Sequence, residues 1–153
     1  MDALDKKLVK RLSEDGRAPI GTLAAQLEVT PPTVRNRIKS LTEAGDLKIS
    51  GMIDPERRPE LTTALVGLRI QSHGKLEQEL EHLAELEGVQ WAAVVTGQYD
   101  VIMEVVVSGG MSDLYQMMTQ VVPKIGQVIQ TETFVVMKSR RKWISPPREG
   151  EGW

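Results

Sequence analysis

A group of polar side chains between residues 30 and 40 has the chemistry needed to bind nucleic acid. Arginine pairs with guanine edges and asparagine with adenine, while lysine and hydroxyl groups bind phosphates. The free backbone N–H groups of an exposed helix start would add a phosphate site. The alternative is an ordinary solvated helix face. The candidate DNA-binding residues are Thr30, Thr33, Arg35, Asn36, Arg37, Lys39 and Ser40.

The segment that carries these residues has the signals of a helix. Thr30 followed by two prolines is typical of a helix start, because the hydroxyl caps the first turn and proline suits the first helical position. Val34, Ile38 and Leu41 recur at helical spacing, so their burial would turn the polar side chains outward. Gly45 is placed to end the helix.

Two further helices are expected before the helix that starts at Thr30. The first has a leucine stripe through Leu8, a cap at Asp2 or Asp5, and an end at Asp15-Gly16. The second covers residues 20–27. Three short helices with a tight turn before the third predict a helix-turn-helix whose third helix enters the major groove. On this placement, Arg37→Ala should abolish specific DNA binding.

The rest of the chain alternates between strand and helix periods. Residues 47–53 alternate apolar and polar side chains, which predicts a strand, and residues 54–59 are turn-rich. Beyond them the pattern predicts a βαββαβ, ferredoxin-like order. The expected elements are strands 61–70, 89–95, 101–107 and 128–137 and helices 75–86 and 112–122. The tail, 139–153, is expected to be mobile or packed on a partner.

The turn between the second and third of these strands could bind a small ligand. Glycine allows close backbone approach, Asp100 could receive an amino group, and nearby hydroxyls could receive a carboxylate. The alternative is a tight β-turn in which Asp100 only hydrogen-bonds its own backbone. The candidate effector-binding residues are Thr96, Gly97, Gln98, Tyr99, Asp100, Thr131 and Thr133.

One sheet face has no helix to cover it in this order. Its side chains are expected to be mainly Val, Ile and Leu, and a large apolar patch is rarely left exposed on a monomer. Two such faces should therefore pack together as a two-fold dimer. Arg69 and Glu104 lie on neighbouring strands, flanked by apolar residues, and we hypothesise that they pair near this interface. Otherwise each simply reaches solvent.

Composition narrows the classes of function. The chain has 153 residues, a net charge of −2 and no cysteine, which excludes disulfides, thiolate zinc sites and cysteine nucleophiles. Residues 1–50 carry nine Lys and Arg against seven Asp and Glu, so the first third is mildly basic. No signal core or membrane-length apolar run appears, so a cytoplasmic protein is expected. His82 lies among Glu79, Glu81 and Glu85, which could suggest a metal site, although a charged helix face is the commoner explanation. His73 lies in a loop, and no phosphate-binding loop, catalytic triad or zinc spacing appears, so we expect no enzyme activity, metal or cofactor.

Taken together, these motifs resemble the Lrp/AsnC (leucine-responsive, or feast/famine) family of regulators along nearly the whole chain. The matching residues are Asp2, Asp5, Leu8, Leu12, Asp15-Gly16-Arg17, Leu23-Ala24, Thr30, Thr33-Val34, Arg37-Ile38, Leu41, Gly45, Gly97, Tyr99-Asp100 and the Thr-rich last strand. Pro19, Thr22 and Asp46 depart from the family pattern. The resemblance implies a winged-type helix-turn-helix, a hinge strand and a ligand-response domain. It also implies face-to-face dimers, often assembled into tetramers or octamers, with amino acids bound near the Gly-x-Tyr-Asp turn.

The expected fold is therefore α+β. It has a winged-helix-like helix-turn-helix domain at 1–50, a hinge strand and linker at 51–62, a βαββαβ ferredoxin-like domain at 63–138, and the tail. The expected function is sequence-specific regulation through double-stranded DNA, modulated by an amino acid or related metabolite through oligomer assembly. Two alternatives are an architectural DNA binder without effector, and a tetrapyrrole decarboxylase of the same architecture.

Overall fold

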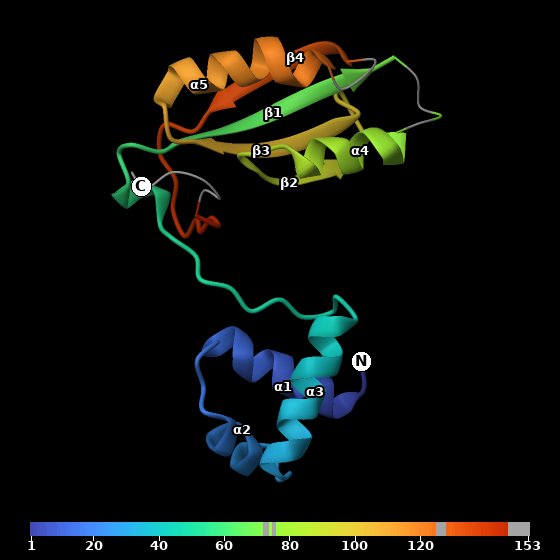
Figure 1. The fold of residues 1–153 in the computed structure, drawn as a ribbon, viewed down its shortest axis with the longest axis vertical. Helices are drawn as coiled ribbons and strands as arrows, with labels where there is room; N and C mark the ends of the chain where they lie inside the picture. The colour runs from blue at the N-terminus through green and yellow to red at the C-terminus, as the bar shows by residue number, and fades with distance from the viewer. Residues whose placement is uncertain (72–73, 75, 125–127, 147–153) are drawn as a thin grey trace. The chain divides into compact units, whose positions relative to one another are not determined.

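The chain forms two compact units, Met1–Ser50 and Gly51–Trp153. The computed structural model describes all residues except 72–73, 75, 125–127 and 147–153. Figure 1 shows an all-helical first unit and a second unit in which helices cover a sheet. Each unit has its own hydrophobic core, and each is described by itself.

The first unit consists of α1 (Ala3–Glu14), α2 (Ile20–Gln26) and α3 (Pro31–Glu43). Asp2 caps α1 in a reciprocal capping box with Asp5, and Thr30 caps α3 ahead of its two prolines. Gly45 has φ +76° just after the end of α3. The shared core is built from Leu8, Leu12, Leu23, Ala24, Val34 and Leu41. These three helices confirm the predicted helix-turn-helix.

The second unit is a four-stranded antiparallel sheet in the order β2-β3-β1-β4. Its elements are β1 (Thr62–Ile70), α4 (Leu76–Glu85), β2 (Val89–Val94), β3 (Val101–Val107), α5 (Gly110–Gln116) and β4 (Val128–Val135). A π-helical turn, Met117–Val121, and a 3-10 turn, Val122–Lys124, extend α5. This order confirms the predicted α+β fold with a ferredoxin-like domain.

Both helices pack on one face of this sheet (Figure 1). Val66 and Leu68 of β1 and Met103 of β3 are fully buried there against Leu83 of α4 and Leu114 of α5. Because successive strand residues point to opposite faces, the residues between them point to the other face, called here the open face. Neither α4 nor α5 covers this open face.

The predicted strand at residues 47–53 is wrong. Residues 47–52 form no regular element, and Ile53 alone makes a β-bridge, to Ile144. An alternating pattern gives a strand only when a neighbouring strand satisfies its backbone groups. Here a short 3-10 turn, Pro55–Arg57, follows the bridge at once. The 51–62 segment is therefore mostly an irregular linker.

The described part of the C-terminal tail, residues 139–146, contacts its own unit through Ile144 and Ser145. Ile144 is only 1% exposed and packs with Leu61 and Val106. The Ser145 N–H donates to Gln90 Oε1 at 2.8 Å, and the Gln90 amide donates to the Ser145 carbonyl at 3.2 Å. The tail is therefore attached to β2 and, through Ile53, to the linker. Residues 147–153 lie outside the described residues.

Candidate functional site

The outward face of α3 presents the predicted polar side chains. Arg35, Asn36, Lys39 and Ser40 are exposed, and Thr33 is half-buried. Val34 and Leu41, on the opposite side of the helix, are buried in the core of the unit. The Lys39 ammonium lies 3.7 Å from the Glu43 carboxylate, but this pair is largely solvated and so holds Lys39 only weakly.

The start of α3 does not offer the free N–H groups expected from the sequence. Pro31 and Pro32 have no backbone N–H. The Thr33 N–H donates to Thr30 Oγ1 at 3.4 Å, and the Val34 N–H donates to the Thr30 carbonyl at 3.2 Å. The hydroxyls of Thr30 and Thr33 also lie 2.9 Å apart. The expected N–H phosphate site is therefore wrong, because the prolines have no N–H to offer and the next two N–H groups donate to Thr30.

Arg37 has partners that the sequence reasoning missed. Its guanidinium donates to Asp2, and to Asp5 Oδ1 at 3.1 Å, which joins α3 to the capping box of α1. Asp5 is buried and Arg37 is half-buried. The capping bond from the Asp5 N–H lowers the pKa of Asp2, partial burial opposes this, and Arg37 lowers it further. Arg37 therefore helps to hold α3 against α1, and its predicted contact with DNA stays a prediction.

The turn Gly97–Asp100 is held to the neighbouring strand. The Asp100 carboxylate accepts the Ile70 N–H at 2.8 Å, and the Asp100 N–H donates to the Leu68 carbonyl at 2.9 Å. The Asp100 carbonyl also accepts the Val95 N–H at 3.0 Å, which closes the turn, and the other two bonds tie the turn to the end of β1. Thr96, Gly97 and Gln98 remain exposed at the tip. Gly97 has φ +123°, a conformation that favours glycine.

Tyr99 lies across the open face of the sheet. A Cβ atom on Gly67 would come within 2.7 Å of the Tyr99 ring, so the ring needs a glycine beneath it. The Tyr99 hydroxyl donates to the Glu132 carboxylate, and this bond, with burial, raises the pKa of Tyr99 above its usual value. Glu132 thus contacts the turn through Tyr99, and it was not among the effector-binding residues predicted from the sequence.

The predicted threonines do not join Tyr99. Thr131 pairs with Leu68 and Thr133 with Val66, so both lie on the helix-covered side of the sheet, at the exposed edge strand β4. Glu132 pairs with Gly67 and so lies on the open face with Tyr99. The predicted effector residues thus separate onto two faces within one chain. The pairing register of β4 with β1 decides which of these residues share a face, and this register could not be predicted from the sequence.

The hypothesised ion pair of Arg69 with Glu104 is wrong. Glu104 lies opposite Leu65 in the register, while Arg69 lies opposite Gln130. Glu104 is 2% exposed on the open face. Its carboxylate accepts the Trp91 indole N–H at 2.8 Å and pairs with the ammonium of Lys142 from the tail.

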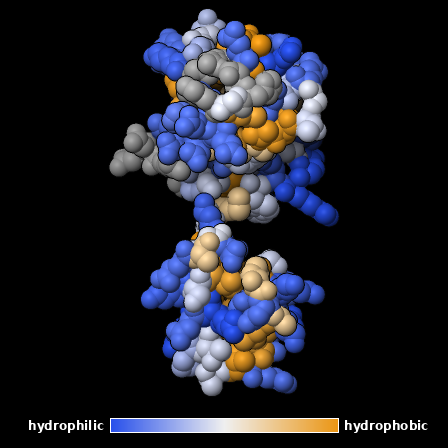
Figure 2. All heavy atoms as spheres, turned by 90° about the vertical axis from the view of Figure 1, so that its right-hand side faces the viewer, coloured by the Kyte–Doolittle hydropathy of each residue, from blue (hydrophilic) through white to orange (hydrophobic). Residues whose placement is uncertain are grey.

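The rest of the open face is partly apolar. Leu65, Trp91 and Phe134 are 38%, 44% and 49% exposed, and they come from three different strands. Figure 2 shows hydrophobic side chains at the surface of each unit, set among hydrophilic ones. The expected face of Val, Ile and Leu is therefore only partly right, since Trp91 on β2, Phe134 on β4 and the buried Glu104 also lie on it.

The remaining titratable candidates form no metal site in the described part of the chain, where no group of three or more His, Asp or Glu side chains comes together. His82 Nδ1 lies 3.9 Å from Glu79 Oε2 one helical turn away. His73 lies outside the described residues. Within those residues, no helix is both long and apolar enough to cross a bilayer.

A helix-turn-helix unit joined to a ferredoxin-like sheet unit defines a DNA-binding regulator with a separate ligand-response domain. Comparison with known families supports the same class of protein. Residues 1–42 match the AsnC-type helix-turn-helix domain, and residues 63–143 match the Lrp/AsnC ligand binding domain. The chain belongs to the Lrp/AsnC family of transcriptional regulators. This placement among regulators agrees with the prediction that the chain is not an enzyme.

Individual relatives match over nearly the full chain. An uncharacterized HTH-type transcriptional regulator of Pyrococcus furiosus is 31% identical and covers 94% of this chain and 95% of its own. The regulatory protein AsnC of Haemophilus influenzae is 24% identical over 91% of this chain and 93% of its own. A transcriptional regulator of Neisseria meningitidis, solved as a complex with L-methionine, shares the fold at a TM-score of 0.73. It is 19% identical and covers 96% of each chain.

Proposed function

We propose that this regulator reads a specific DNA sequence with the outward face of α3. The observation that carries the proposal is the exposure of Arg35, Asn36 and Lys39 on one side of a helix whose other side is buried. Ser40 and the half-buried Thr33 continue this face. Arginine and asparagine give base contacts, and lysine and hydroxyls give phosphate contacts.

Selection from a random duplex library with the full chain tests this proposal. An enriched sequence is expected, with a two-fold arrangement if the protein binds as a dimer. On the selected duplex, Arg35→Ala/Lys39→Ala should weaken binding by about tenfold or more, and a lost phosphate contact should lower the salt slope by about one. Fluorescence anisotropy at several salt concentrations measures both quantities.

A matched variant separates local contacts from net charge. Lys124 and Lys138 are exposed cations of the sheet unit. Lys124→Ala/Lys138→Ala removes the same charge, yet it should leave affinity nearly unchanged. Equal losses in the two variants would contradict the placement of DNA on α3. Binding without any enriched sequence would instead indicate an architectural DNA binder.

We also propose that the open face of the sheet is the dimer interface and that dimers assemble into tetramers or octamers. Leu65, Trp91 and Phe134 leave apolar surface there that a second copy would cover. Phe134→Asp should shift the mass measured by light scattering towards the monomer. Tyr115→Asp, at a 70% exposed position on α5, should leave the mass unchanged. A Phe134→Asp protein of undiminished mass would contradict this interface.

The proposed effector is an amino acid or related metabolite, bound in the cytoplasm near Gly97–Asp100 and acting through assembly. The exposed tip at Thr96–Gln98 and the methionine complex of the Neisseria relative support this. Since Thr131 and Thr133 face away from Tyr99, a complete site would need a second chain. A thermal-shift screen of the amino acids, with light scattering, should find one that raises the unfolding temperature and changes the mass distribution. Gln98→Ala should weaken that response, and an undiminished response would argue against this location.

A further inference from the structure

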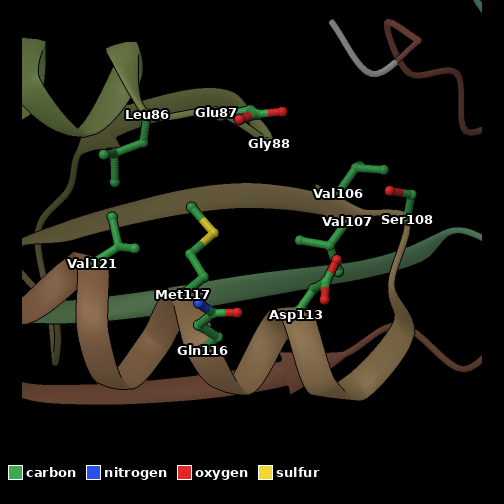
Figure 3. A pocket seen from close by; sticks show the side chains of 10 residues that line it. All are labelled: Leu86, Glu87, Gly88, Val106, Val107, Ser108, Asp113, Gln116, Met117 and Val121. Carbon is green, nitrogen blue, oxygen red and sulfur yellow. The ribbon is translucent and has the colours of Figure 1, made fainter. Parts of the chain in front are cut away.

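A cavity of about 440 Å³ opens between the two helices of the sheet unit, at the end of β3. Figure 3 shows it between the turn that follows α4, the end of β3, and α5 with its π-helical extension. This volume lies within the range of small-molecule sites.

The cavity has an apolar wall and a charged rim. Leu86, Val107, Met117 and Val121 supply aliphatic and thioether surface. Glu87 comes from the turn after α4 and Asp113 from α5, and their carboxylates lie on opposite sides of β3 in Figure 3. Both side chains are exposed, as are the two polar neighbours Ser108 and Gln116. None of the ten residues that line the cavity carries a positive charge.

This cavity is separate from the turn proposed as the effector site. The turn Gly97–Asp100 precedes the first residue of β3, whereas Val107 is the last residue of the strand and Ser108 follows it. The seven residues of β3 span roughly 20 Å at the usual rise per strand residue. A ligand in one place therefore does not occupy the other.

We propose that this cavity binds a small organic cation, a primary amine on an aliphatic body. Two carboxylates with no nearby lining cation attract an ammonium group, and the apolar wall covers the hydrocarbon. A free amino acid fits this site poorly, because its own carboxylate would meet Glu87 or Asp113. The inference thus goes beyond the proposed function and adds a second, chemically distinct ligand site to the same domain.

Titration of the full chain with 3-methylbutylamine tests the proposal. Met117 is 7% exposed at the cavity wall, so its ¹³C-labelled methyl signal, assigned with Met117→Leu, reports binding there. We expect saturable movement of this signal with the amine. Leucine and 3-methylbutan-1-ol, which carry an added carboxylate or lack the charge, should bind at least about tenfold more weakly.

Variants of the rim sharpen the test. Glu87→Gln and Asp113→Asn should each weaken amine binding about threefold, and together about tenfold. Glu77→Gln/Glu81→Gln removes two exposed charges from α4 outside the cavity and should leave binding unchanged. Absence of saturable movement, equal binding of leucine, or equal losses in both double variants would overturn the proposal. No DNA is present in this titration, so its failure would not bear on the role of α3.

Discussion

The outward face of α3 and the open face of the sheet use polar side chains in opposite ways. On α3, Arg35, Asn36 and Lys39 are exposed, and the ion pair of Lys39 with Glu43 is largely solvated. On the sheet, Glu104 is 2% exposed and is held by Trp91 and Lys142. The exposed charges on α3 are free to bind a ligand, whereas the buried Glu104 is committed to the structure.

Residue type alone therefore does not identify a functional charge. Arg37 shows this within the helical unit, since it lies on the same helix as Arg35 but is paired with Asp2 and Asp5. Burial and partners decide the role. Substitutions can separate the charges that support the fold from those that are free to bind a ligand.

The largest effect is expected at the buried pair of the sheet unit. Among the described residues, Lys142→Met leaves the Glu104 carboxylate with only the Trp91 indole N–H as a partner, and it should lower the free energy of unfolding by about 1–3 kcal/mol. This loss of stability is smaller than the loss expected for a fully buried ion pair, because the Lys142 side chain is 28% exposed. The three tryptophans all belong to the second unit, so urea unfolding followed by their fluorescence measures it.

A double variant is the control for this prediction. In Lys142→Met/Glu104→Gln no charge is left unpaired, so stability should recover part of the loss. If the double variant is less stable than Lys142→Met by the full cost of a second, independent substitution, the two residues do not act as a pair.

A smaller effect is expected at Arg37. Arg37→Ala removes the link between α3 and α1, so the helical unit should unfold more easily, seen as an earlier loss of helical circular dichroism. Its DNA affinity should fall with this instability and should partly recover at lower temperature. Arg35→Ala should lose affinity with no change in unfolding. An Arg37→Ala protein of unchanged stability that no longer binds DNA would instead make Arg37 a base-reading residue.

The smallest effect concerns the titration of Tyr99. Its bond to Glu132 raises the pKa of Tyr99, so the stability from this bond is present below the ordinary tyrosine pKa of 10.0 and is lost as pH rises through the raised value. In a Tyr115→Phe background, where Tyr99 is the remaining tyrosine, absorbance should show ionisation above pH 10.0. Glu132→Gln should move this ionisation to lower pH, and an unmoved curve would exclude the bond.

Much of the fold could be predicted because its signals are local. The Thr30 cap, the two prolines and the spacing of Val34 and Leu41 define α3 within a dozen residues. The turn at Gly97 and the bounds of β3 follow from equally short patterns. The strand predicted at residues 47–53 failed because Ile53 alone in this segment has a β-bridge partner, Ile144 of the tail.

Local sequence patterns were therefore enough to predict the two units, most of their elements and the polar face of α3, since helix and strand periods act between near neighbours. Tertiary structure alone decided which charges are paired. Arg37 reaches Asp5 in another helix, and Glu104 pairs with Lys142 of the tail. It also decided that Thr131 and Tyr99 lie on opposite faces, because strand register sets the face and register is a property of the assembled sheet.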